Sequence, residues 1–287
     1  MKKALFWKKM DKQIQCQLCP HFCMIKQGEK GKCGVRENIN GELFSLVYGK
    51  SCSMAIDPIE KKPLFHFHPG EKAFSIATAG CNLSCKYCQN WEISQQEIEK
   101  ILYNSLLPSQ IVDLAKQAKC KIIAFTYTEP TIFYEYMLET AKLAKQKGMF
   151  CVMITNGFIN PEPLKKLFPY IDAFNVDIKS INEKFYKDVC SATLKPVLET
   201  IKLIYKHGKH IEITNLLIPK YNDSDKEIEK LVSWIIENLD KKIPLHFSAF
   251  YPCYQFKSIQ PESKEKVLHA VEIAKKQGME NVYSGNI

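Results

Sequence analysis

Three closely spaced cysteines are the residues of this chain best suited to metal chemistry. Cys81, Cys85 and Cys88 form a Cys-x3-Cys-x2-Cys segment directly after a short apolar run at residues 74–78. Soft sulfur ligands select iron–sulfur clusters, and three thiolates can hold three irons of a 4Fe–4S cluster. Because no fourth cysteine stands close by in the sequence, one iron would stay open to a substrate or cofactor.

A buried helix face and a zinc site are the alternatives to an open cluster at these cysteines. Positions i, i+4 and i+7 lie along one face of a helix, and cysteine is a common buried residue. The intervening Asn82, Ser84 and Lys86 are too polar for a helix core. A zinc site would want four ligands, usually in pairs. The open cluster therefore accounts for the pattern best.

A second group of cysteines stands near the N-terminus. Cys16, Cys19, Cys23 and Cys33 follow a Cys-x2-Cys-x3-Cys-x9-Cys pattern that glycines and a proline interrupt, which is typical of a ligand-bearing loop. Four soft ligands suit a closed tetrahedral zinc or a second cluster. Four unligated thiols in a reducing compartment are the alternative, and the sequence does not decide between the metals.

The central cysteine loop, with Tyr87 before its last cysteine, resembles the signature of the radical S-adenosylmethionine (SAM) superfamily. The resemblance runs from about Cys16 to the end of the chain. It is strongest to the pyruvate formate-lyase activating enzymes and, among them, to the radical SAM enzymes of the AmmeMemoRadiSam system. Their Asp-Pro-Ile-Glu-Lys-Lys-Pro-Leu segment stands here at residues 57–64.

The resemblance implies a radical reaction. The 4Fe–4S cluster would cleave SAM reductively to methionine and a 5′-deoxyadenosyl radical, which would abstract hydrogen from a substrate that the sequence does not identify. One alternative is an activating enzyme that installs a glycyl radical on a partner protein. Rivals from other classes are an iron–sulfur electron carrier without SAM chemistry and a zinc-binding interaction protein. Related enzymes with extra clusters usually place the added cysteines after the SAM motif, which favours zinc for the N-terminal four.

Apolar strand patterns alternate with amphipathic helix patterns after the cluster loop. We expect strands at residues 74–78, 122–127, 150–155, 173–178, 211–218 and 245–250. We expect helices at residues 108–118, 131–148, 163–168, 195–207, 224–238 and 261–278. This alternation predicts an α/β fold with a parallel sheet and right-handed crossovers. Six such units resemble the partial (βα)6 TIM-like barrel of the family.

The chain divides into two parts in this interpretation. Residues 1–70 are a Cys-rich N-terminal extension that includes a β-hairpin within residues 42–56, where β-branched residues alternate with polar ones. Residues 71–287 are the radical SAM barrel. His66 and His68 lie on the loop between the two and are weak site candidates.

In a barrel of this type, the active site gathers at the carboxyl ends of the strands. Three strands end in Thr128-Glu129-Pro130, Thr155-Asn156-Gly157 and Asp177-Ile178-Lys179. The resemblance implies that SAM is held by Tyr87, Thr128, Glu129, Asn156, Asp177 and Lys179. Glu129 would accept the SAM ammonium, since a charged donor wants a carboxylate beside the cluster. Ordinary turns and an Asp177–Lys179 salt bridge are the structural alternatives.

The composition limits the cellular locations and the kinds of binding partner that we expect for this protein. No apolar run approaches the ~20 residues that span a bilayer, and the basic N-terminus lacks the apolar core of a signal peptide. Twelve cysteines without such a signal predict a cytoplasmic protein. The net charge is +9, but Arg36 is the only arginine, which disfavours specific nucleic-acid recognition. We expect a low-potential electron donor, a flavodoxin or ferredoxin, and allow for a protein substrate.

Overall fold

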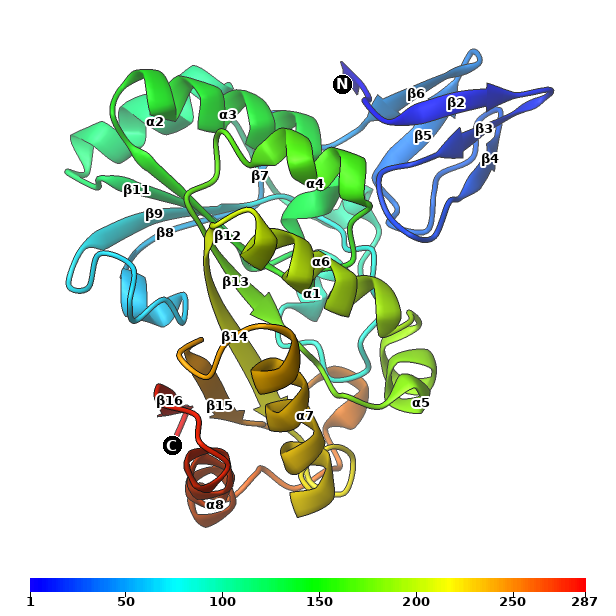
Figure 1. Cartoon of the computed structure of the whole chain (residues 1–287). Coiled ribbons are helices and arrows are strands. Elements are labelled where there is room, and N and C mark those ends of the chain that lie inside the picture. Colours follow the sequence, from blue (N-terminus) through cyan, green and yellow to red (C-terminus); the bar gives the residue numbers. More distant parts are fainter.

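The computed structural model describes residues 1–287 and is built around one eight-stranded sheet (Figure 1). Seven strands are parallel, and their order across the sheet follows the chain. They are β9 (Lys72–Ala77), β11 (Ile122–Phe125), β12 (Phe150–Thr155), β13 (Ala173–Asp177), β14 (His210–Leu217), β15 (Leu245–Ala249) and β16 (Val282–Gly285). An antiparallel edge strand, β8 (Ser53–Pro58), pairs with β9. Since β8 and β16 do not pair, the barrel is partial, and the predicted fold class is confirmed.

Helices connect the parallel strands and cover one face of the sheet (Figure 1). They are α2 (Pro108–Gln117), α3 (Tyr134–Gln146), α4 (Pro161–Leu167), α6 (Lys195–Lys206), α7 (Asp225–Asn238) and α8 (Lys264–Lys276). In α6, Val197, Ile201 and Ile204 are buried at the spacing of one helix face. The start of α7 is fixed because the Ser224 side chain accepts a hydrogen bond from the backbone of Glu227. Each helix thus buries one apolar stripe on the sheet.

The N-terminal extension forms two small antiparallel sheets beside the barrel, at the upper right of Figure 1. One contains β2 (Trp7–Met10), β3 (Gln13–Cys16) and β4 (Met24–Lys26). The other contains β1 (Lys2–Lys3), β6 (Glu42–Ser45) and β5 (Arg36–Ile39). Arg36 joins the extension to the barrel, because its Nη2 lies 3.1 Å from the Glu135 carboxylate of α3.

Two sequence predictions about the N-terminal region were wrong in detail. The predicted hairpin within residues 42–56 does not form: β6 pairs with the preceding β5, and β8 joins the main sheet. The predicted boundary at residue 70 therefore cuts through the barrel sheet. Alternation of apolar and polar residues located these strands correctly but could not choose their partners, since any strand edge can pair.

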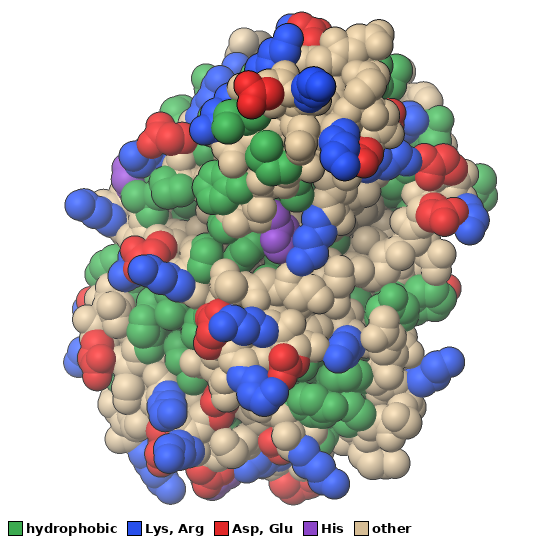
Figure 2. Space-filling view, turned by 90° about the vertical axis from the view of Figure 1, so that its right-hand side faces the viewer, with side chains coloured by type: hydrophobic (Ala, Val, Ile, Leu, Met, Phe, Trp, Pro, Cys, Tyr) green, Lys and Arg blue, Asp and Glu red, His purple; other side chains and the backbone are tan.

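None of the helices has both the length and the apolar character needed to cross a bilayer. Figure 2 shows one face of the molecule, on which lysines lie next to acidic side chains over much of the surface. Many of these charges form exposed ion pairs, such as Lys165 with Glu162 at 3.0 Å.

Candidate active site

All the residues predicted for the central cluster and for SAM line one cavity of about 380 Å³. The cavity lies at the carboxyl ends of the parallel strands, where loops follow β9, β11, β12 and β13. Its wall includes Cys81, Cys85, Tyr87, Cys88, Thr128, Glu129, Asn156, Asp177 and Lys179. Residues separated by nearly a hundred positions in sequence are therefore brought together by the sheet register.

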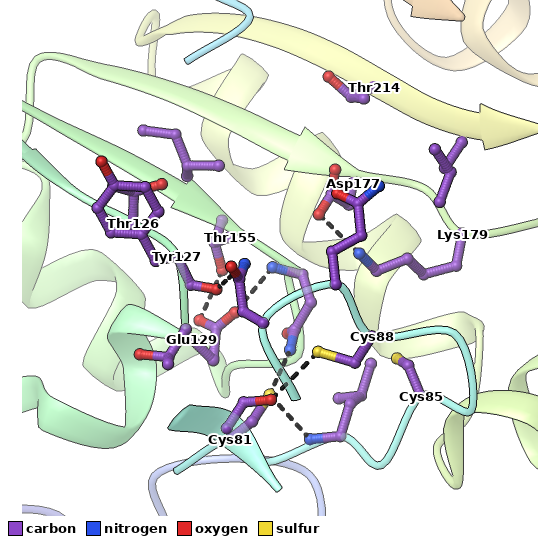
Figure 3. Close-up of a pocket in the computed structure, with 18 of the residues that line it drawn as sticks. Cys81, Cys85, Cys88, Thr126, Tyr127, Glu129, Thr155, Asp177, Lys179 and Thr214 are labelled. Carbon is purple, nitrogen blue, oxygen red and sulfur yellow. Dashed lines mark hydrogen bonds and ion pairs between the residues drawn. The ribbon is translucent and has the colours of Figure 1, made fainter. Parts of the chain in front are cut away.

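The cysteine loop faces this cavity from one side (Figure 3). Its backbone is held by bonds from Ser84 N to Cys190 O and from Lys86 N to Val189 O, both 3.0 Å. The Asn82 side chain donates to Phe158 O at 2.8 Å, which ties the loop to the turn after β12. The three thiols are therefore presented by a fixed loop.

The environment of the sulfur atoms fits thiolate ligands. The backbone N–H of Leu83 donates to Cys81 Sγ at 3.4 Å, and the Ser94 hydroxyl lies 3.1 Å from Cys88 Sγ. Burial raises the pKa of the Cys81 and Cys88 thiols. Binding a metal cluster would displace their protons, because only thiolates are ligands. Three thiols on one wall of a roomy cavity match a 4Fe–4S cluster with one open iron.

Two further cysteines, which no sequence pattern predicted, pack against this loop. A hydrogen bond with Cys190 and burial raise the pKa of Cys85, and the Tyr87 hydroxyl lies 3.8 Å from Cys190 Sγ. Cys253 donates to Tyr87 O at 3.1 Å. Neither Cys190 nor Cys253 lines the cavity, so three thiols face it. Cys190 and Cys253 lie far from the loop in the sequence, so no spacing pattern indicated this contact.

Glu129 accepts more hydrogen bonds from the protein than we expect of a carboxylate that binds a ligand. Its Oε1 accepts from the Thr131 hydroxyl at 2.6 Å and from the Thr155 hydroxyl at 2.7 Å. Its Oε2 accepts from Asn156 N at 2.8 Å. Burial raises the pKa of Glu129, although these donors oppose the shift. The carboxylate therefore links the ends of β11 and β12. Its Oε2 accepts only one of these hydrogen bonds and can accept another from a ligand.

Asn156 connects the strand ends to the cysteine loop. Its side-chain amide donates to Asn82 Oδ1 at 2.9 Å, and its Oδ1 accepts from Phe158 N at 2.9 Å. The same amide lies 3.9 Å from Cys81 Sγ. Asn156 thus orients the loop at the first cysteine. Thr128 is fixed as well, since its hydroxyl donates to Thr78 O at 2.7 Å.

Asp177 and Lys179 form an ion pair at the opposite side of the cavity from Glu129 (Figure 3). Lys179 Nζ lies 2.6 Å from Asp177 Oδ2. Burial opposes the charge of Lys179, but Asp177 and Cys85 outweigh it and raise the pKa of the ammonium. Lys179 therefore stays charged and favours anionic groups, including thiolates, beside it.

A second cavity of about 490 Å³ adjoins the first and shares Lys61, Lys62, Tyr127 and other wall residues with it. Lys62 is buried, and its Nζ lies 2.8 Å from Asp57 Oδ2. The Tyr127 hydroxyl donates to the same oxygen at 3.0 Å. Burial lowers the pKa of Lys62 against the opposing effect of Asp57. Residues 57–64 stood out in the sequence only for their family resemblance, which did not predict this polar wall.

His66 and His68 do not reach the active-site cavity. The ring of His66 lies 2.6 Å from the Tyr283 hydroxyl, and the ring of His68 packs on Phe150. The backbone of His66 donates to the buried Glu212 at 2.8 Å. These contacts hold the loop after β8 against the barrel, so both histidines have a structural role.

The four N-terminal cysteines also come together. Cys16, Cys19, Cys23 and Cys33 line one small cavity that is separate from the active site. The sequence spacing therefore identified a real cluster of thiols, although it could not show their arrangement.

The fold and the cavity define an enzyme class in which a barrel presents three cysteines beside a SAM-sized pocket. A profile of the radical SAM superfamily matches residues 75–235, and the chain belongs to this superfamily. Its cofactors are a 4Fe–4S cluster and SAM. When bound, they supply reductive cleavage of SAM to methionine and a 5′-deoxyadenosyl radical.

One relative covers the whole chain, and others cover most of it. An uncharacterized protein of Methanocaldococcus jannaschii is 48% identical over 100% of this chain and 86% of its own. The pyruvate formate-lyase-activating enzyme of Streptococcus mutans is 22% identical over 70% of this chain and 83% of its own. Among solved structures, SuiB of Streptococcus suis bound to SAM has a TM-score of 0.57 at 15% identity, over 72% of this chain and 48% of that one. That likeness concerns the fold.

Proposed function

We propose that the residues around the 380 Å³ cavity divide into cluster ligands and a SAM cradle. Cys81, Cys85 and Cys88 would hold three irons, and SAM would lie between them and the strand ends. The observation that carries this assignment is that residues from four successive strand ends share one cavity with the three thiols. The cradle consists of Tyr87, Thr128, Glu129, Asn156, Asp177 and Lys179.

The residues of the cradle differ in what they do. Lys179 suits the SAM carboxylate, because it is a charged donor beside the cluster loop. Glu129 offers its remaining Oε2 acceptor site to the ammonium and positions Asn156 through the backbone. Asn156 in turn holds the loop at Cys81, so that a change at Glu129 reaches both the cofactor and the loop.

The substrate would occupy the adjoining 490 Å³ cavity, where its hydrogen can approach SAM. Cavities of this size suit small molecules or one side chain of a peptide. A protein substrate is supported by the names of relatives, among them the activating enzyme of pyruvate formate-lyase. A glycyl radical on a partner protein is the second candidate on this ground. The electron would come from a low-potential flavodoxin or ferredoxin.

Two matched ion pairs test the cradle. Asp177 pairs with Lys179 at the carboxyl edge of the sheet, and Asp172 pairs with Lys145 near the amino edge, both at 2.6 Å. Asp177→Asn should weaken SAM binding about tenfold with the iron content unchanged, since it releases Lys179 from the cavity wall. Asp172→Asn should leave SAM binding unchanged. Equal SAM affinity in both variants, measured by anaerobic equilibrium dialysis, would refute the cradle.

The protein-substrate hypothesis has its own readout. The reduced enzyme is incubated with SAM and candidate partner proteins, and electron paramagnetic resonance (EPR) is recorded at each step. A glycyl radical on the partner gives a long-lived signal and makes that chain cleave at one site in air. Hydrogen abstraction without such a signal would favour a small molecule or another protein residue as the substrate.

A further inference from the structure

The four N-terminal cysteines enclose a space that is too large for a single ion. Their cavity measures about 20 Å³, and about 10–15 Å³ already admits a water molecule. A tetrahedral zinc lies about 2.3 Å from each sulfur and leaves no such space. No three of these side chains converge on one point that could hold an ion, and the same is true of the active-site cysteines. Neither set thus has the close spacing of a site for a single ion.

Each of the two cysteine groups has a sulfur that accepts a hydrogen bond from a backbone N–H. In the quartet, Lys32 N donates to Cys23 Sγ at 3.4 Å. In the active-site triplet, Leu83 N donates to Cys81 Sγ at 3.4 Å. Such bonds stabilise thiolates and tune iron–sulfur clusters.

Two cysteines outside these groups act as donors instead. Cys120 donates to Ala118 O, and Cys253 donates to Tyr87 O, as neutral thiols do.

The only arginine of the chain supplies an independent observation. Arg36 is 1% exposed and lines the quartet cavity. Its Nη2 is satisfied by Leu5 O at 2.6 Å and by Glu135, but its Nε has no hydrogen-bond partner. A buried N–H without an acceptor is unfavourable. A sulfur-rich anion in the cavity would provide both the acceptor and the negative charge.

We propose that Cys16, Cys19, Cys23 and Cys33 bind a second 4Fe–4S cluster, toward which the Arg36 Nε–H donates. With four protein ligands this cluster is closed, so it has no open iron for SAM. The proposal replaces the zinc that the family resemblance favoured, because the cavity and the unpartnered N–H fit a group larger than one ion. It does not depend on the assignment of the SAM cradle.

The proposed cluster would neighbour the active site. Thr131 lines the quartet cavity, and its hydroxyl donates to Glu129 of the active-site cavity at 2.6 Å. Gly80, one residue before Cys81, packs against Cys33 so closely that an added Cβ would lie 2.8 Å from Cys33 O. The two sites therefore share a wall.

The test removes the active-site ligands and measures what the full chain still binds. The Cys81→Ala/Cys85→Ala/Cys88→Ala variant is reconstituted anaerobically with iron and sulfide. We expect about four irons and four sulfides per chain, with absorbance near ~400 nm and an EPR signal after dithionite reduction. Stoichiometric zinc without sulfide in protein purified with both metals present, or no bound metal, would overturn the proposal.

Matched variants separate binding from misfolding. Adding Cys23→Ala to the triple variant should remove the remaining iron, whereas adding Cys120→Ala should not. Should the triple variant fail to fold, the wild type decides the matter. About eight irons per chain, with SAM perturbing the EPR signal of only one of two clusters, supports the proposal, and about four irons per chain overturns it.

Discussion

The two cysteine groups of this protein differ in the space beside them. The active-site triplet opens onto about 380 Å³ of polar cavity, with Lys179 and Glu129 on its walls. The N-terminal quartet surrounds about 20 Å³, walled mainly by apolar side chains such as Leu18, Ile25 and Ile132. Both sets receive backbone N–H donors at sulfur. With the proposed assignments, the number of thiols and the room beside them distinguish a centre that can react from one that is closed.

The charges near the two groups follow the same division. Lys179 is paired with Asp177 at the rim of a cavity, where a ligand can exchange one of these contacts. Arg36 is paired with Glu135 in a fully buried setting and holds the extension to the barrel. A charge at the first site can therefore exchange its partner for a ligand, while Arg36 at the second site keeps Glu135 as its partner and has only its Nε–H left for the proposed cluster.

The largest expected effect separates the two groups by function. Cys85→Ala should abolish formation of 5′-deoxyadenosine from SAM and remove the part of the ~400 nm absorbance that belongs to this cluster. Iron at the quartet should remain. Product is measured by chromatography after anaerobic reduction, with Cys120→Ala as the control for loss of a buried thiol. Turnover that persists in Cys85→Ala would contradict the ligand assignment.

The anchor of the extension should be the next most sensitive feature. Glu135→Gln leaves the Arg36 guanidinium buried without its carboxylate, which should cost about 3–5 kcal/mol of unfolding free energy. Glu162→Gln removes an exposed pair with Lys165 and should cost less than about 1 kcal/mol. Anaerobic urea titration compares the two. Equal midpoints would mean that the buried pair does not hold the extension.

The contact between the two regions can be broken at Gly80. Its φ of +95° is unfavourable for other residues, and an added Cβ would lie 2.6 Å from Val35 Cγ1. Gly80→Ala should therefore lower the free energy of unfolding by about 2–4 kcal/mol. Gly148→Ala is a matched control, because Gly148 has a φ of +69° and open space around it. A similar loss in both variants would show that strain alone, and not the contact, matters.

The loop behind the proposed substrate wall should be acid-sensitive through Glu212. Burial opposes ionisation of Glu212, but His210, His246 and two backbone amides outweigh it and lower its pKa from 4.5 to about 2. A carboxyl group whose pKa is lowered by folding stabilises the folded state at pH values above its pKa in the unfolded chain. This stabilisation is lost as pH falls from 4.5 toward 2. The free energy of unfolding of the wild type should exceed that of Glu212→Gln by about 2–3 kcal/mol at pH 7. The two values should converge near pH ~2. A gap independent of pH would contradict this.

The smallest predicted effect concerns SAM binding. Glu129→Ala should weaken SAM binding about ten- to a hundredfold, or about 1.5–3 kcal/mol, with iron content retained. The loss combines the missing acceptor for the ammonium with the freed Asn156 backbone. An unchanged dissociation constant in anaerobic dialysis would leave Glu129 as a turn residue only.

Much of the site could be predicted because its residues sit at strand ends. Buried strands such as residues 150–155 are largely apolar, so the polar Asn156 that follows marks the edge of the sheet. Cys190 and Lys62 could not be predicted, since they reach the site from loops whose paths depend on tertiary packing. The hairpin error has the same origin, because the partner of β8 is set by the whole sheet.

The role of Arg36 was also invisible in the sequence. As the single arginine of a lysine-rich chain it stood out by composition, but its burial against Glu135 and the quartet emerges only from the fold. The planar, delocalised guanidinium of Arg suits a buried ion pair with a carboxylate, as with Glu135 here.

Cleavage of SAM tests the radical chemistry of this protein most directly. Wild-type protein, reconstituted anaerobically with iron and sulfide and reduced with dithionite, is incubated with SAM, and the products are quantified. We expect methionine and 5′-deoxyadenosine in equal amounts, above the level that Cys85→Ala produces. Intact SAM after prolonged incubation with a fully loaded, reduced protein that binds SAM would contradict it.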